Sequence, residues 1–168
     1  MTPLETPRLV LCPYLPADRE FFVDLNCDSE VRRYMNGPLT PPAADQLFSD
    51  ILAGQAGGLD ASWAITEREL GAFVGHAFLN RDESHPFPEL GFLLLKQFWG
   101  RGYATESARR LVEYSWTELA LPGLSASVDC DHAPSQRVLE KAGFRRESTA
   151  VDEHGSYYIY TIEPPGPR

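Results

Sequence analysis

The hydrophobic pattern is clearest between residues 89 and 116. Residues 90–95 form a short, almost wholly apolar run that Lys96 closes, which is typical of a buried strand. Further on, apolar residues recur at helical spacing, at Ala104, Ala108, Leu111, Val112 and Trp116. The loop between these two stretches contains Gly100 and Gly102. The pattern therefore predicts a strand, a glycine loop and an amphipathic helix.

The rest of the chain alternates between the two periodicities. Strands are predicted at residues 8–11, 62–66, 72–79, 124–128, 145–151 and 157–162. Helices are predicted at residues 16–26, 28–35, from about 41 to 56, and from Pro134 to Gly143. The short helix at 28–35 would be capped by Asp28 and stopped by Asn36-Gly37-Pro38. This alternation of helices and strands predicts an α/β fold.

The glycine loop has the features of an anion site. Glycines lack the Cβ atoms that would keep backbone N–H groups from converging, and the helix that follows points its positive end at the loop. The loop is not a dinucleotide fingerprint, because it lacks the third glycine and because Glu118 lies at the end of the same predicted helix. No Gly-Lys-Ser or Gly-Lys-Thr occurs, which excludes a Walker loop. A phosphate held by backbone amides is the expected ligand.

Length and composition predict a single globular domain over residues 1–163, followed by an unstructured tail at 164–168. No apolar run is long enough to span a bilayer, and the first residues lack a signal-peptide pattern, so we expect a cytoplasmic protein that does not bind membranes. The three cysteines, Cys12, Cys27 and Cys130, form no Cys-x-x-Cys pair. We therefore expect reduced thiols and no metal site.

Two motifs carry a family resemblance. The first is Gln97-Phe98-Trp99-Gly100-Arg101-Gly102 with the Tyr-Ala-Thr-Glu that follows, and the second is the stretch from Ser135 to Phe144. Together with the opening Thr6-Pro7-Arg8-Leu9-Val10-Leu11, they make the chain resemble the GNAT superfamily of acetyl-CoA-dependent N-acetyltransferases. The closest likeness is to the branch that includes the ribosomal-protein N-terminal acetyltransferases. The resemblance implies a GNAT fold, with a mixed, mostly antiparallel sheet of about seven strands flanked by helices.

The resemblance also implies how acetyl-CoA binds. The pantetheine arm would bond the backbone of the central strand at Leu93, Leu94 and Leu95. The pyrophosphate would lie on the loop residues Gln97, Gly100, Arg101, Gly102, Tyr103, Ala104 and Thr105. Ser135 would lie near the thioester sulfur. His132 stands where the family usually has an asparagine that bonds the pantetheine; an imidazole can still make one such bond, but it is bulkier and can titrate near neutral pH.

Acetyl transfer by direct attack of an amine needs a group that removes the amine proton. Glu89 is the first candidate, Glu147 the second and His76 the third, although a lone carboxylate can also be a plain surface charge. Ser135 would serve the leaving thiolate, and it could equally cap the following helix. Tyr158 or Tyr160 are the alternatives for that proton. The rival from another class is a catalytically silent acyl-CoA-binding sensor.

Charge gives a hint about the acceptor. The formal net charge is −9, from 24 acidic and 15 basic side chains. This sign disfavours a nucleic-acid partner and mildly favours a cationic acceptor such as a polyamine, an aminoglycoside or a basic peptide. A protein N-terminus is the other acceptor that the resemblance implies. The oligomeric state stays open, with a homodimer among the options.

Overall fold

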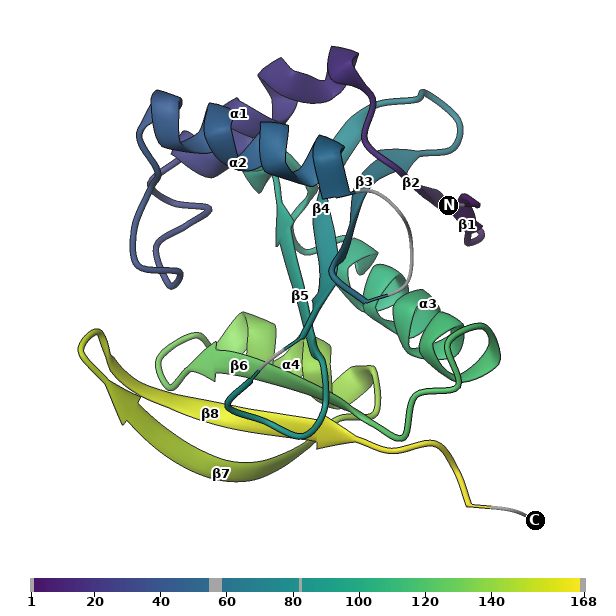
Figure 1. Cartoon of the computed structure of the whole chain (residues 1–168), viewed down its shortest axis with the longest axis vertical. Helices are drawn as coiled ribbons and strands as arrows, with labels where there is room; N and C mark the ends of the chain where they lie inside the picture. Colours follow the sequence, from purple (N-terminus) through teal and green to yellow (C-terminus); the bar gives the residue numbers. More distant parts are fainter. Residues whose placement is uncertain (1, 55–58, 82, 167–168) are drawn as a thin grey trace.

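The computed structural model describes residues 2–54, 59–81 and 83–166, and its strands form one eight-stranded sheet in the order β1-β2-β3-β4-β5-β6-β8-β7 (Figure 1). The strands are β1 (Leu4–Glu5), β2 (Leu9–Cys12), β3 (Ala61–Glu67), β4 (Phe73–Asn80), β5 (Glu89–Leu94), β6 (Leu124–Asp129), β7 (Arg145–Asp152) and β8 (Gly155–Ile162). The helices are η1 (Pro16–Asp18), α1 (Arg19–Cys27), α2 (Pro41–Gly54), η2 (Lys96–Phe98), α3 (Tyr103–Thr117) and α4 (Ala133–Lys141).

The sheet is mixed and mostly antiparallel, as predicted. Neighbouring strands pair antiparallel except β5 with β6, which pair parallel. The sheet has one strand more than predicted, because Leu4 and Glu5 pair with Leu11 and Val10 of β2. A strand of two residues is too short to show an alternating pattern in the sequence.

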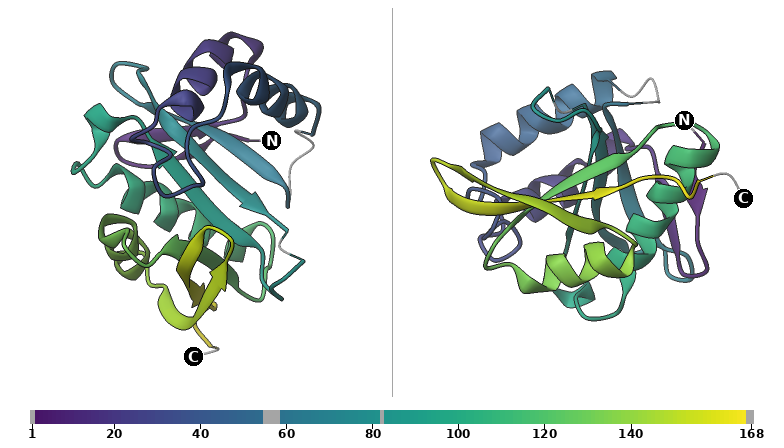
Figure 2. Two further views of the ribbon diagram at one scale, coloured as in Figure 1. Left: turned by 90° about the vertical axis from the view of Figure 1, so that its left-hand side faces the viewer. Right: turned by 90° about the horizontal axis from the view of Figure 1, so that it is seen from below.

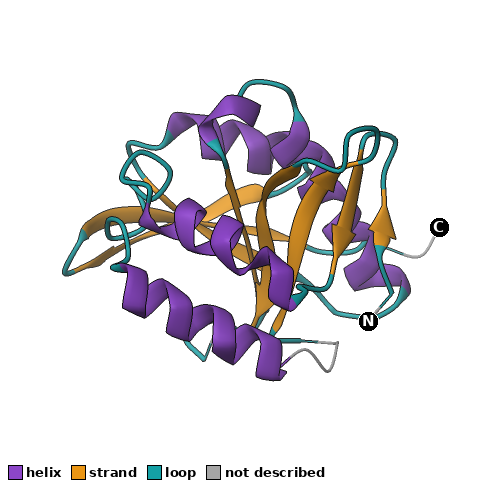
Figure 3. Cartoon of the chain, turned by 90° about the horizontal axis from the view of Figure 1, so that it is seen from above, coloured by secondary structure: helices purple, strands orange, loops and turns teal. Residues whose placement is uncertain are grey.

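Helices cover both faces of the sheet (Figures 2 and 3). The pair α1 and α2 lies on one face, and α3 and α4 lie on the other. Successive side chains of a strand point to opposite faces, so each central strand contributes to two cores. In β3, Trp63 and Ile65 join the core beneath α3, whereas Ala64 joins Phe22 and Phe48 in the core beneath α1 and α2.

The predicted helix at residues 28–35 is wrong, because residues 29–36 form successive turns instead. The backbone reverses at Asn36 and Gly37, with φ of 63° and 81°. The side chain of Arg32 holds this reversal, since its Nε donates to the Gly37 carbonyl at 2.9 Å. A side chain that bonds the backbone locally competes with helix formation.

The remaining boundaries agree closely with the predictions. The helix expected from 41 to 56 runs from Pro41 to Gly54, and residues 55 and 56 lie outside the described part. Of the predicted tail, residues 164–166 have no regular structure, and residues 167 and 168 lie outside the described part. No helix among the described residues is long and apolar enough to cross a bilayer.

Candidate active site

Strands β5 and β6 separate almost as soon as they meet. Their ladder holds one pair, Glu89 with Ser125, next to a hydrogen bond of 2.8 Å from Ser125 N to Pro88 O. Beyond this pair β6 turns away from β5 (Figure 1). The Pro88 carbonyl faces β6, and the backbone groups of every second residue point to the same side of a strand. Those of Phe92 and Leu94 therefore face the resulting gap. A ligand in this gap would find backbone donors and acceptors, as an added strand would.

The three leucines predicted to bind the cofactor face different ways. Leu94 lies on the gap side, and its carbonyl accepts a hydrogen bond of 2.8 Å from Trp99 Nε1. Leu95 turns toward β4, where its N–H donates to Val74 O at 2.9 Å. Leu93 is buried, and its side chain lies on the wall of a cavity on the other side of the strand. The gap and the cavity therefore meet at β5.

The glycine loop follows β5 and has the backbone expected of an anion site. Gly100 and Gly102 have φ of 72° and 81°, a conformation that side chains other than glycine rarely adopt. In the described part of the chain, the amides of Gly100, Arg101 and Gly102 donate to no protein oxygen. The first turn of α3 adds the amides of residues 103–105, which have no partner within the helix. These residues fit a pyrophosphate.

The side chains of the loop point in different directions. Gln97 and Arg101 are exposed, while Tyr103 is buried and donates its hydroxyl hydrogen to Glu67. Tyr103 thus offers only its amide to the loop, and Ala104 and Thr105 are half-buried on α3.

Arg8 fixes the loop from behind. Its Nη1 donates to the Arg101 carbonyl at 2.9 Å, and its guanidinium lies 4.6 Å from the centre of the Tyr103 ring. Glu106 holds Arg8 in turn through an ion pair of 2.7 Å to Nη2, and Glu106 itself accepts a hydrogen bond of 2.6 Å from the Thr6 hydroxyl. With its carbonyl bound from behind, the loop keeps its amides on the opposite side.

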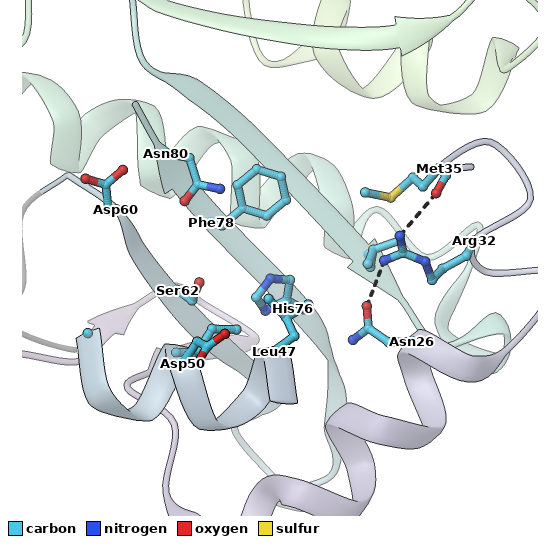
Figure 4. A pocket seen from close by; sticks show the side chains of 13 residues that line it. Asn26, Arg32, Met35, Leu47, Asp50, Asp60, Ser62, His76, Phe78 and Asn80 are labelled. Carbon is cyan, nitrogen blue, oxygen red and sulfur yellow. Dashed lines mark hydrogen bonds between the residues drawn. The ribbon is translucent and has the colours of Figure 1, made fainter. Parts of the chain in front are cut away.

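A cavity of about 450 Å³ lies on the α1–α2 face of the sheet (Figure 4). The sheet contributes the side chains of Ser62, His76, Phe78, Asn80 and Leu93 to its wall. Its other wall comes from α1, α2 and the turns between them, with Asn26, Arg32, Met35, Leu47, Asp50, Ile51 and Gly54, and Asp60 lies at its edge. Its size suits a small ligand or the end of a peptide.

His76 is the predicted base that lies inside this cavity. Burial, aided by the nearby charge of Arg32, lowers the pKa of His76 to about 3, so the imidazole is neutral at physiological pH. Its Nδ1 lies 2.9 Å from the hydroxyl of Tyr14, whose own pKa burial raises. A general base works best with a pKa near the working pH, so His76 is better suited to hydrogen bonding than to removing the amine proton.

Glu89 lies on the cavity face of the sheet. It is the direct antiparallel partner of Asn80, which lines the cavity, and opposed residues of two strands share one face. Its side chain is half-buried. Leu93 is four positions further along the strand, a distance of roughly 13 Å. A proton would therefore reach Glu89 through water.

The predicted second motif lies across the gap, at the start of α4. Ser135 Oγ is 3.3 Å from His132 Nε2, and burial lowers the pKa of His132 against the opposing effect of Asp129. The ring of Tyr34 stacks on His132 with 4.3 Å between centroids. Lys96, at the start of η2, forms an ion pair of 2.5 Å with Glu30. The turns at 29–36 thus contact both sides of the gap.

The other predicted candidates lie elsewhere. Glu147 is exposed on β7 and pairs with His85 at 3.2 Å, away from the cavity lining. Tyr160 is 1% exposed and donates its hydroxyl to Glu140 at 3.1 Å, so its proton is directed into α4. Tyr158 is half-buried beneath Arg146, whose guanidinium is 4.4 Å from the ring centre. The structure therefore places Glu89 and His76 on one face of the sheet, and it brings His132 and Ser135 together across the gap.

The model of the acetyltransferase (GNAT) domain family matches residues 8–145. The chain belongs to the GNAT acetyltransferase family. The uncharacterized N-acetyltransferase p20 of Bacillus licheniformis is 30% identical over 161 residues, which covers 90% of this chain and 87% of p20. YdaF of Bacillus subtilis (strain 168), provisionally named a ribosomal N-acetyltransferase, is 32% identical over 73 residues, which covers 44% of this chain and 40% of YdaF.

Solved structures agree on the fold. A GNAT-family acetyltransferase from Bacillus anthracis superposes with a TM-score of 0.86 at 22% identity, covering 96% of this chain and 98% of that one. The predicted family is confirmed, and the chain is an acetyl-CoA-dependent N-acetyltransferase.

The sequence motifs did not predict several polar residues of the cavity, among them Asn26, Arg32, Ser62 and Asn80. One signal was available for the strand residues. Ser62, His76 and Asn80 occupy even positions in two strands whose other residues are mostly apolar, and polar residues at alternate positions of buried strands indicate a lined pocket. Asn26 and Arg32 gave no such signal.

Proposed function

We propose that this GNAT protein transfers the acetyl group of acetyl-CoA to a primary amine that enters the cavity beneath α1 and α2. The observation that carries the proposal is the position of β5, whose backbone faces the gap on one side while Leu93 lines the cavity on the other. Acetyl-CoA in the gap and an amine in the cavity would meet at Leu93 and Leu94. The acceptor classes are a small amine and a protein N-terminus.

The reaction is a direct attack. The amine nitrogen bonds to the thioester carbon, the carbon–sulfur bond breaks, and the sulfur leaves as a thiolate that takes up one proton. A backbone N–H of β5 would stabilise the oxyanion, since oriented donors at the carbonyl oxygen lower the barrier. Glu89 accepts the amine proton through water, and Ser135 serves the thiolate. The position of Glu89 on the cavity face and of Ser135 across the gap supports these roles.

The test is thiol release from acetyl-CoA in the presence of single amines, drawn from amino acids, polyamines, aminoglycosides and short peptides. We expect thiol release that depends on the presence of one amine class, and we expect mass spectrometry to detect the acetylated amine. Tight acetyl-CoA binding with no release for any amine would contradict the proposal and favour a silent acyl-CoA sensor.

A further inference from the structure

Arg32 stands on the cavity wall where α1 gives way to the turns (Figure 4). Its Nε donates to Gly37 O at 2.9 Å, its Nη1 to Asn26 Oδ1 at 2.9 Å, and its Nη2 to Met35 O at 3.1 Å. All three acceptors are neutral oxygens. A guanidinium has five N–H donors, so two remain for a ligand.

The charge of Arg32 is unmatched within the described residues. Other arginines, including Arg8, Arg19, Arg68 and Arg81, each form an ion pair with a carboxylate. No carboxylate of the described chain pairs with Arg32, although its side chain is half-buried. Burial lowers the pKa of Arg32, against the opposing effect of Cys27. A partly buried guanidinium without an anion is costly unless a ligand supplies one.

The position of the guanidinium is fixed before any ligand arrives. Asn26 is 1% exposed and donates its Nδ2 to Phe22 O at 2.9 Å, which leaves its Oδ1 to accept from Arg32. A side chain held in this way loses little freedom on binding. Arg32 is therefore a cation held in a fixed position on the cavity wall.

We propose that Arg32 binds a carboxylate of the acceptor, and that the acceptor is a small amino-carboxylate of the amino-acid type. This inference rests on the proposed function, because it assigns a ligand to the same cavity. Arginine forms strong, directional bonds with carboxylates. Arg32 and Leu93 line the same cavity, so a carboxylate on Arg32 would hold a nearby amine within the space that reaches β5.

The opposite side of the cavity orients such a ligand. Asp50 and Asp60 lie across from Arg32 (Figure 4) and repel a carboxylate. Asp60 already pairs with Arg81 at 3.4 Å, and Asp50 accepts a hydrogen bond from Gln46 at 2.9 Å. The acceptor would therefore enter with its carboxylate toward the turns at 29–36. A polyamine has no group for Arg32 and would place a positive charge beside it.

The test compares each amino acid with its own carboxamide. L-Phenylalanine, L-methionine and L-lysine are assayed beside their carboxamides, with spermidine and a short peptide as further acceptors, at saturating acetyl-CoA. We expect kcat/KM for at least one carboxylate to exceed that of its amide by about tenfold to hundredfold, the range of a hydrogen-bonded charge. In Arg32→Gln this ratio should fall to within about twofold of unity, and Arg32→Lys should keep part of it.

Arg33→Gln is the matched control, because it removes the same charge from the next residue, which is exposed and does not line the cavity. It should keep the wild-type ratio. A purely structural role of Arg32 would change carboxylate and amide equally, so a ratio unchanged in Arg32→Gln would overturn the inference. So would wild-type protein that prefers amides, spermidine or the peptide, while the proposed acetyl transfer would stand. The absence of thiol release with every amine tested would overturn both.

Discussion

The two halves of the site are built from different materials. On the donor side, the gap along β5 and the loop up to α3 offer backbone amides, which the positive φ of Gly100 and Gly102 makes accessible. On the acceptor side, the cavity is lined by side chains from α1, the turns, α2, β3, β4 and β5. Backbone recognition tolerates changes of sequence, whereas side-chain recognition changes with each substitution. One half thus suits a constant co-substrate and the other a ligand that differs between relatives.

Removing the proposed base should lower the rate more than any other substitution described below. General bases contribute roughly 10² to 10⁴ in rate, so Glu89→Gln should lower kcat by that factor and leave acetyl-CoA affinity nearly unchanged. Its activity should also shift to alkaline pH, where more of the amine is already neutral. Steady-state kinetics across pH tests this, with Glu83→Gln as control because Glu83 is exposed in the preceding loop. A wild-type rate and pH profile in Glu89→Gln would show that Glu89 is a plain surface carboxylate and not the base.

A side chain in the glycine loop should break the donor half alone. In Gly102→Val, a β-branched residue would be forced to φ of 81°, and its Cβ would lie 3.3 Å from Arg8 Nη2. We expect acetyl-CoA affinity to fall by about 100-fold or more, the equivalent of one to two strained or lost contacts. Calorimetry measures this in protein whose folding circular dichroism has confirmed.

Gly71→Val is the matched control for strain. Gly71 has φ of 64°, faces open space and lies in the turn between β3 and β4. It should lose stability as Gly102→Val does while binding acetyl-CoA normally. Unchanged binding in a folded Gly102→Val protein would show that the loop is not the phosphate site.

The burial of His76 in the acceptor half should make the free energy of unfolding depend on pH. The folded chain keeps His76 neutral down to a pH of about 3, whereas the unfolded chain protonates it below about 6.5. The unfolded state thus binds more protons in this window, and stability falls as pH decreases from 6.5 toward 3. From pH 6.5 to 5 the loss is about 1.6 kcal/mol.

Urea unfolding of wild type and His76→Gln at several pH values isolates this contribution. The variant should have the shallower pH dependence over that range, whatever its absolute stability. Parallel curves for the two proteins would mean that His76 takes up a proton as readily in the folded state as in the unfolded state. The cavity would then be more accessible to water than its packing indicates.

The smallest expected effect concerns the leaving group. Ser135→Ala should lower kcat by up to about 10², the lower end for proton transfer, without the alkaline shift of Glu89→Gln. The reason is that Ser135 acts after the amine has attacked. Comparing the two pH profiles checks this order. An alkaline shift in Ser135→Ala would place Ser135 on the route of the amine proton instead.

The difference in material also explains what the sequence could predict. The strand, loop and α3 follow from local patterns, namely an apolar run, two glycines and a helical repeat, and the structure places them as expected. The turns at 29–36 did not follow, because Arg32 bonds Gly37, Met35 and Asn26 and thereby replaces a local helix with contacts set by tertiary packing. The cavity depends on the register of β3, β4 and β5 and on how α1 and α2 pack over them. Neither this register nor this packing is encoded in a short window of sequence.

Hydrogen exchange with and without acetyl-CoA reports on the donor half and the acceptor half of the site separately. We expect slower exchange for the amides of Phe92, Leu94 and residues 100–105 when acetyl-CoA is bound, and little change at the cavity residues of α1 and α2. Protection confined to α1 and α2, with none along β5 or the glycine loop, would contradict it.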